Sequence, residues 1–208
     1  MNQLIGLSSN FDFTFPDERR ENTNTSLRSL VQVHSTAELV TIYFSLHNTD
    51  PTAILANGCF CSHLDGTAPP ISNTAGPYDD ICRHNRICAR CSQRELTATG
   101  SSNCDFFESY PYGIDTSAGT GIECPGADAQ TTVCQAFRCE CDMATARALL
   151  AEHRSGTEVA NGNCVEKVRN SEFVPKACCG RNPRYAVYRE DLEVCGVDAE
   201  GGPILTLI

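Results

Sequence analysis

Cysteine is the residue type through which this chain has the widest scope for chemistry. Fourteen of the 208 residues are cysteines: none precedes position 59, ten fall between 59 and 141, and four between 164 and 195. So many thiols form disulfides in an oxidising compartment, or else bind metal or carry out redox chemistry. Paired CxxC knuckles, which mark structural zinc sites, are missing from the spacing. The cysteines therefore predict a secreted, extracellular protein that is cross-linked by disulfides. They are Cys59, Cys61, Cys82, Cys88, Cys91, Cys104, Cys124, Cys134, Cys139, Cys141, Cys164, Cys178, Cys179 and Cys195.

Polar residues among the cysteines have the types that a hydrolytic site needs. His84, Asn85 and Arg86 are consecutive, and Asp142 lies on a later segment. A histidine can act as a general base toward water, and an aspartate can orient it or bind a cation. Neighbouring residues of a helix point about 100° apart. The helix register therefore decides whether His84 or Asn85 faces the site.

The first helix that could position these residues has two candidate starts. An apolar stripe at helical spacing comprises Leu30, Val33, Ala37, Val40 and Phe44. The capping box from Ser35 to Glu38 allows the helix to begin only there.

Further helices are expected at roughly 79–96, with Asp79 as N-cap, and at roughly 135–154, ended by Ser155-Gly156. The turn-rich segment 97–133 between them is expected to contain a short hairpin.

Three cysteine-bearing segments share their spacing with a known family. They are Gly58-Cys59-Phe60-Cys61, Asp79-Asp80-Ile81-Cys82 with Cys88 six residues on, and Cys134-Gln135-Ala136-Phe137-Arg138-Cys139-Glu140-Cys141-Asp142. Through these motifs, residues 33–154 resemble secreted phospholipase A2. The resemblance implies a mainly α, disulfide-rich fold with two long cross-linked helices and a small β-hairpin.

The resemblance also implies a set of disulfides. It pairs Cys61–Cys82, Cys88–Cys141, Cys104–Cys134 and Cys124–Cys139, and it sends Cys59 to the C-terminal tail. Ile81 and Ala148 replace both cysteines of one further family bridge. No partner is assigned to Cys91, Cys164, Cys178, Cys179 or Cys195.

The residues that carry catalysis in the family are changed in this chain. Counted from Cys82, Asn85 occupies the position of the histidine base and Arg86 that of the calcium-binding aspartate. Asp142 matches the aspartate that orients the base. A register slipped by one residue would make His84 the base and Asn85 the calcium position.

Both registers lack the carboxylate that would bind calcium. Calcium needs several hard oxygen ligands, whereas Arg86 would place a cation at the position of the ion. Ser62 and Leu64 stand where the family has loop glycines, and their side chains restrict the backbone. We therefore expect no catalysis, no metal and no cofactor. Asp142 is expected to form a structural clip with Asn85 or Arg86.

The tail resembles a galaxin-type di-cysteine module. Cys178-Cys179-Gly180 begins it, and Val194 replaces one cysteine of the expected second pair. An ordinary disulfide-pinned hairpin is the alternative. The apolar residues 203–208 are expected to pair as a strand, either within the domain or with a neighbour.

Three parts are expected: an N-terminal arm (1–32), a phospholipase A2-like domain (33–158) and a cysteine-rich, galaxin-like extension (159–208). The arm carries a glycosylation sequon at Asn24. It also carries the alternating Phe11, Phe13 and Phe15, whose shared face is expected to dock on a neighbouring chain.

Charge narrows the expected partners. With 26 acidic and 16 basic residues, the formal net charge is −10, which argues against nucleic acid. No apolar stretch is long enough to predict a transmembrane segment.

The expected function is that of a secreted, non-catalytic structural component of an extracellular matrix or assembly. Its partners would be copies of itself or other extracellular chains, with lipid or mineral contact as narrower cases. The alternatives are a calcium-dependent secreted phospholipase A2 and a secreted lipid- or receptor-binding module.

Overall fold

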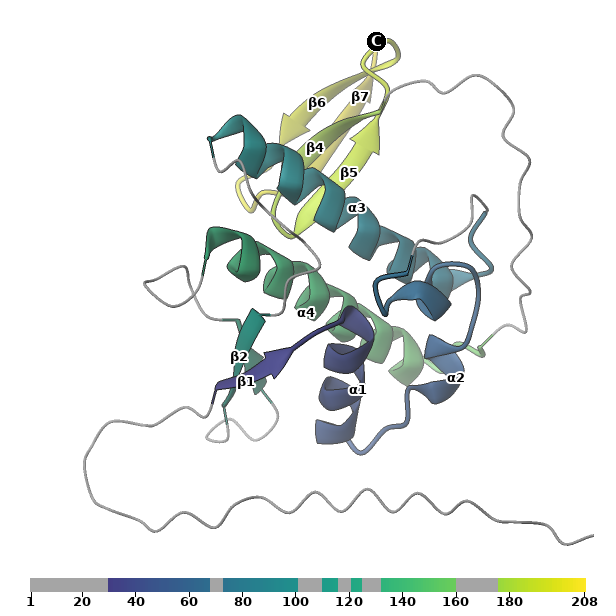
Figure 1. The fold of residues 1–208 in the computed structure, drawn as a ribbon. Coiled ribbons are helices and arrows are strands. Elements are labelled where there is room, and N and C mark those ends of the chain that lie inside the picture. Colours follow the sequence, from purple (N-terminus) through teal and green to yellow (C-terminus); the bar gives the residue numbers. More distant parts are fainter. Residues whose placement is uncertain (1–29, 68–72, 101–109, 116–120, 125–131, 160–175) are drawn as a thin grey trace, which may run out of the picture.

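The computed structural model describes residues 30–67, 73–100, 110–115, 121–124, 132–159 and 176–208. The α-helices in these ranges are α1 (Thr36–Leu46), α2 (Thr52–Leu55), α3 (Pro77–Ala98) and α4 (Val133–Arg154), and a 3-10 helix spans Cys61–His63. The strands are β1 (Leu30–Val33), β2 (Tyr110–Asp115), β3 (Gly121–Glu123), β4 (Ala177–Arg181), β5 (Arg184–Tyr188), β6 (Glu193–Val197) and β7 (Pro203–Leu207). Figure 1 shows α3 and α4 at the centre, with β4–β7 beside α3 and α1 beside α4. None of the described helices is long and apolar enough to cross a bilayer.

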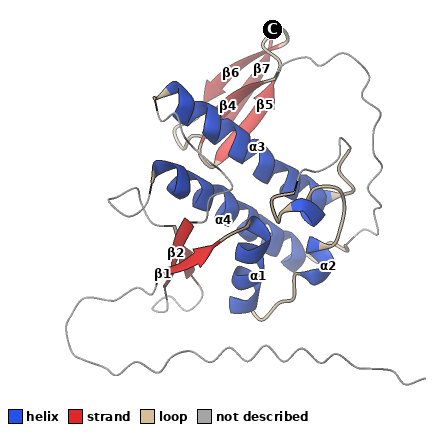
Figure 2. Cartoon of the chain, viewed as in Figure 1, coloured by secondary structure: helices blue, strands red, loops and turns tan. Residues whose placement is uncertain are grey.

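The two long helices, α3 and α4, lie side by side (Figure 2), and the sequence colours of Figure 1 show that they run antiparallel. Cys88 of α3 is bonded to Cys141 of α4. Near the start of α3, the Tyr78 hydroxyl donates to the carbonyl oxygen of Thr157, just beyond the end of α4, at 2.7 Å. Both helices were predicted, and each extends two residues beyond at least one of its expected ends.

The ends of these helices follow from local sequence chemistry, with one correction. Helix α3 begins at Pro77, whose fixed φ suits the first helical position, after Gly76 at φ +144°. Asp79 is therefore not the N-cap; it lies inside the first turn, where its carboxylate is favourable to the helix dipole. Helix α4 begins at the capping box of Thr132 and Gln135.

Residues 30–33 form strand β1, so the earlier of the two candidate helix starts is wrong and the start at the capping box is confirmed. β1 pairs antiparallel with β2, which in turn pairs with β3, and the β2–β3 pair is the expected hairpin. Val33 lies opposite Tyr110, and both are completely buried. Pairing with a distant strand thus overrides the helical periodicity, and α1 begins after its N-cap Ser35.

Strand β1 also extends the folded region into the predicted arm. The rest of that arm, with Asn24 and the three alternating phenylalanines, lies outside the described residues.

The main core lies between α1, α3, α4 and the turn that follows α2. Its members include Phe44, Ile54, Tyr78 and Leu149, which are at most 1% exposed. A second cluster joins α1 and α4 to the small sheet through Leu39, Met143 and Ile122. These clusters hold the long helices against the loop that follows α2.

Three of the predicted disulfides are confirmed: Cys61–Cys82, Cys88–Cys141 and Cys124–Cys139. Cys134 is also disulfide-bonded, but its predicted partner Cys104 lies outside the described residues. Two further bridges, Cys91–Cys178 and Cys179–Cys195, use cysteines that the sequence left unassigned.

These bridges reduce the number of tail cysteines that could be the predicted partner of Cys59. Cys59 is disulfide-bonded, and the three described tail cysteines are bonded elsewhere. Cys164 is the tail cysteine that remains for this prediction, and it lies outside the described residues.

The tail consists of two antiparallel hairpins, β4–β5 and β6–β7. The Cys179–Cys195 bridge joins the hairpins, and the Cys91–Cys178 bridge ties the first hairpin to α3. The C-terminal residues thus pair within their own chain as strand β7. Because strands make up the tail, the description as mainly α suits the centre of the molecule better than the whole.

Candidate functional site

The register of α3 places Asn85, and not His84, opposite Asp142. The Asn85 side-chain nitrogen donates to Asp142 Oδ1 at 2.9 Å and to Thr145 Oγ1 at 3.1 Å. Asn85 and Asp142 are 7% and 2% exposed. His84 is exposed, and its Nδ1 lies 2.9 Å from the carbonyl oxygen of Asp80. Asn85 therefore makes the expected hydrogen bond to Asp142, and His84 does not face this carboxylate.

Asp142 has further partners on three other side chains. Thr36 at the start of α1 donates to Oδ1 at 2.8 Å, and the Tyr110 hydroxyl donates to Oδ2 at 2.7 Å. Arg138 Nε lies 3.6 Å from Oδ2. Together with Asn85, Thr36 and Tyr110 give the carboxylate three hydrogen bonds, and Arg138 adds an ion pair. Asp142 therefore joins α1, α3, α4 and β2.

Arg138 balances the buried charge of Asp142. It is 6% exposed, donates to the carbonyl oxygen of His34 at 3.2 Å and places its guanidinium carbon 5.3 Å from the centre of the Tyr110 ring. Burial, and then the charge of Asp142, raise the pKa of Tyr110 well above its usual value. Tyr110 thus remains protonated and keeps its role as a donor.

Arg86 extends from α3 to the loop that follows the turn at Cys59-Phe60-Cys61, called here the CxC turn. Its Nη2 donates to the carbonyl oxygen of His63 at 2.8 Å and also to that of Thr67. Burial lowers the pKa of Arg86 from its usual value, but a guanidinium remains charged at neutral pH. A calcium ion would have to displace this cation to reach the two carbonyl oxygens.

Asp79 fixes the CxC turn from inside α3. Its carboxylate is 1% exposed and accepts backbone amides from Cys59 at 3.1 Å, Phe60 at 2.6 Å, Cys61 at 3.1 Å and Ala75 at 2.9 Å. Gly58 has φ +70°, and a Cβ there would come within 2.3 Å of Asp79 Cγ. The turn therefore requires glycine at 58 and an acceptor at 79.

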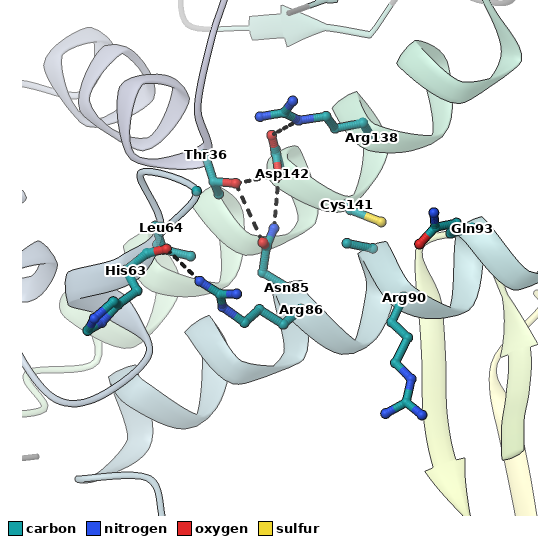
Figure 3. Close-up of a pocket in the computed structure, with 12 residues that line it drawn as sticks. Thr36, His63, Leu64, Asn85, Arg86, Arg90, Gln93, Arg138, Cys141 and Asp142 are labelled. Carbon is teal, nitrogen blue, oxygen red and sulfur yellow. Dashed lines mark hydrogen bonds and ion pairs between the residues drawn. The ribbon is translucent and has the colours of Figure 1, made fainter. Parts of the chain in front are cut away.

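A cleft of about 210 Å³ lies between α3, α4 and the loop. Figure 3 shows Thr36, Asn85 and Asp142 meeting on one side of it, Arg86 turned toward His63, and Arg90 extending away from that cluster. No group of three histidine, cysteine or acidic side chains suited to a metal ion occurs in the described ranges. The polar groups that line the described part of the cleft are thus amide, hydroxyl, imidazole and guanidinium groups and one carboxylate.

A second hollow, of about 240 Å³, lies between α3 and α4. Ile81 and Ala148, which replace the two expected cysteines, both line it. The two positions at which the resemblance expects a bridge thus lie around one hollow.

Sequence reasoning found Asn85, Arg86 and Asp142 but missed the partners that complete the cluster. Arg138 carries a detectable signal, because it precedes Asp142 by four residues on one helix. Thr36 and Tyr110 carry none, since α1 and β2 bring them in from distant parts of the chain.

Comparison with known proteins adds no assignment: no family model matches the chain, and no curated protein or solved structure does so either.

Proposed function

We propose that the chain is a secreted, non-catalytic protein on a phospholipase A2-like scaffold that serves as a structural component of an extracellular assembly. One observation carries the proposal. At the two positions where the motif comparison expects the base and the calcium ligand, Asn85 donates to Asp142 and Arg86 binds the loop carbonyls. Both side chains make structural contacts in place of catalytic ones.

The chemistry of these side chains argues against hydrolysis. An asparagine amide cannot take a proton from water, and general-base help is typically worth about 10²–10⁴ in rate. A bound metal adds several kcal/mol of charge stabilisation in the transition state, and Arg86 repels such an ion. His84, the nearest candidate base along the chain, is exposed and contacts Asp80.

The C-terminal hairpin supports a role in assembly. Val194 and Ile204 belong to one face of the hairpin, because Val194 pairs with Thr206 and Ile204 with Gly196. They are 57% and 50% exposed, and Ile208 beyond the strand is 81% exposed. Clustered apolar side chains of this kind mark interaction surfaces. A second copy of the chain is the occupant that the proposal requires.

Sedimentation velocity across micromolar concentrations tests the assembly. The wild type is expected to self-associate, and the double variant Val194→Glu with Ile204→Glu is expected to stay monomeric. Val133→Glu is the matched control, because Val133 is 41% exposed at the start of α4. A wild type that remains monomeric but binds one lipid or one receptor with fixed stoichiometry would favour the alternative binding module.

A further inference from the structure

The cleft combines positive charge with a strongly acidic chain. The formal net charge is −10, yet the cleft is lined by Arg86, Arg90 and Arg138 and by a single carboxylate, Asp142. Arg138 and Asp142 balance one another across 3.6 Å. The charges of Arg86 and Arg90 therefore dominate the described cleft.

These two arginines have no close counter-ion among the described residues. Arg86 contacts neutral carbonyl oxygens, and Asp65 acts on it only at longer range. Arg90 is exposed and makes no hydrogen bond or ion pair within the described ranges. Both lie on α3, four residues apart, which brings them to the same side of the helix.

Arg86 also has unused donors. Nη2 makes both of its hydrogen bonds to the described residues, and Nε is buried. A guanidinium has five N–H donors in a rigid fork, so the two donors of Nη1 are the ones left for a ligand. An anion in the cleft would be bound through Nη1.

We propose that this cleft binds a tetrahedral oxyanion, a phosphate or sulfate group, between the guanidinium groups of Arg86 and Arg90. Arg86 is the fixed half of the site, because the loop carbonyls of His63 and Thr67 hold it. Arg90 points away from Arg86 in Figure 3, and an exposed side chain without a partner changes rotamer within nanoseconds. It can therefore close over a bound anion. Charge-assisted contacts from guanidinium forks suit the several oxygens of such a group.

The inference rests on the proposed function in one respect, namely that Arg86 and not calcium holds the loop.

Isothermal titration of the full chain with inorganic phosphate in the presence of EDTA tests the site. Saturable binding with one phosphate per chain is expected, with sulfate as a competitor. Arg90→Gln should weaken binding about tenfold, as expected from the loss of a charge-assisted contact. Arg147→Gln, which removes an exposed arginine of α4 outside the cleft, should leave the affinity unchanged. Arg86→Lys keeps the charge but loses the fork, and it should also weaken binding.

The source of the anion is separated by two further probes. Binding of glycerol 3-phosphate points to soluble phosphate groups. Co-sedimentation with phosphatidic acid vesicles, but not with phosphatidylcholine vesicles, combined with weaker binding of the soluble probes, points to a lipid headgroup. Both results support the site.

Absence of phosphate binding at millimolar concentration would overturn the inference, as would equal loss of binding in Arg90→Gln and Arg147→Gln. If phosphate bound only after calcium was added, the proposed function would fail together with the inference. If neither calcium nor phosphate bound, the inference alone would fail.

Discussion

Replacing Asp142 with asparagine should be strongly destabilising. The carboxylate is 2% exposed and accepts from Thr36, Asn85 and Tyr110. An amide in its place has one oxygen and one donor nitrogen, so at least one of these donors would face another donor. Arg138 would also remain buried without its counter-ion.

The size of the effect follows from the buried pair. Removing one partner of a buried ion pair costs roughly 3–5 kcal/mol. For a chain of this length, each kcal/mol lowers Tm by about 2–4 °C, so the expected shift is roughly 6–20 °C. Urea unfolding followed by circular dichroism, with the disulfides intact, measures the free energy. Glu140→Gln is the matched control, because Glu140 is an exposed carboxylate on the same helix, and it should change stability by less than about 0.5 kcal/mol.

A double variant separates the ion pair from the hydrogen bonds. Replacing Arg138 by leucine together with Asp142→Asn removes both charges, so the double variant should be more stable than Asp142→Asn alone. A cost below about 1 kcal/mol for Asp142→Asn would refute the view that this cluster holds the helices together.

Three further results are expected. Asp79→Asn should cost about 2–4 kcal/mol in urea unfolding, because the amide presents a donor to the four backbone amides that the carboxylate accepts; the half-exposed Asp80→Asn is the control, and equal effects would contradict this role. Replacing Cys91 and Cys178 by serine should raise hydrogen exchange in β4–β7 and leave α3 and α4 protected through Cys88–Cys141; unchanged exchange in the tail would mean that the bridge does not anchor it. Burial raises the folded-state pKa of three tyrosines. Their contribution to the free energy of unfolding should be fully present below pH 10, the usual tyrosine pKa, and should be lost as pH rises above it, because the unfolded chain loses their protons first. Unfolding free energy and ultraviolet absorbance against pH test this, and ionisation of every tyrosine near pH 10 in the folded protein would contradict it. The three are Tyr78, Tyr110 and Tyr185.

The centre of the fold was predictable because the spacing of its cysteines resembles that of secreted phospholipase A2, and the resemblance implies two long cross-linked helices. Cys82 and Cys88 lie six residues apart on α3, and each bonds a different partner. Asn85 lies three residues before Cys88, on the side of α3 that faces α4, and it bonds Asp142 there. A local signal also located the start of α1, after the N-cap Ser35.

The remaining features depend on contacts between distant segments, which local patterns do not encode. The apolar spacing of Leu30 and Val33 suits a helix, but β2 pairs with this segment and makes it a strand. Asp79 had the type and place of an N-cap, yet Gly76-Pro77 starts the helix earlier and turns Asp79 toward the CxC turn. The Cys91–Cys178 bridge likewise spans 87 residues, and no local spacing predicts it.

Calcium binding tests the central claim most directly. Calorimetric titration of the wild-type chain with calcium should show no saturable binding at millimolar concentration, and phospholipid vesicles should release no fatty acid above background with or without calcium. Asn85→His combined with Arg86→Asp should recover little, because Ser62 and Leu64 still restrict the loop. Stoichiometric calcium binding by the unmodified chain, with calcium-dependent fatty acid release that is lost on replacing His84, would contradict the account.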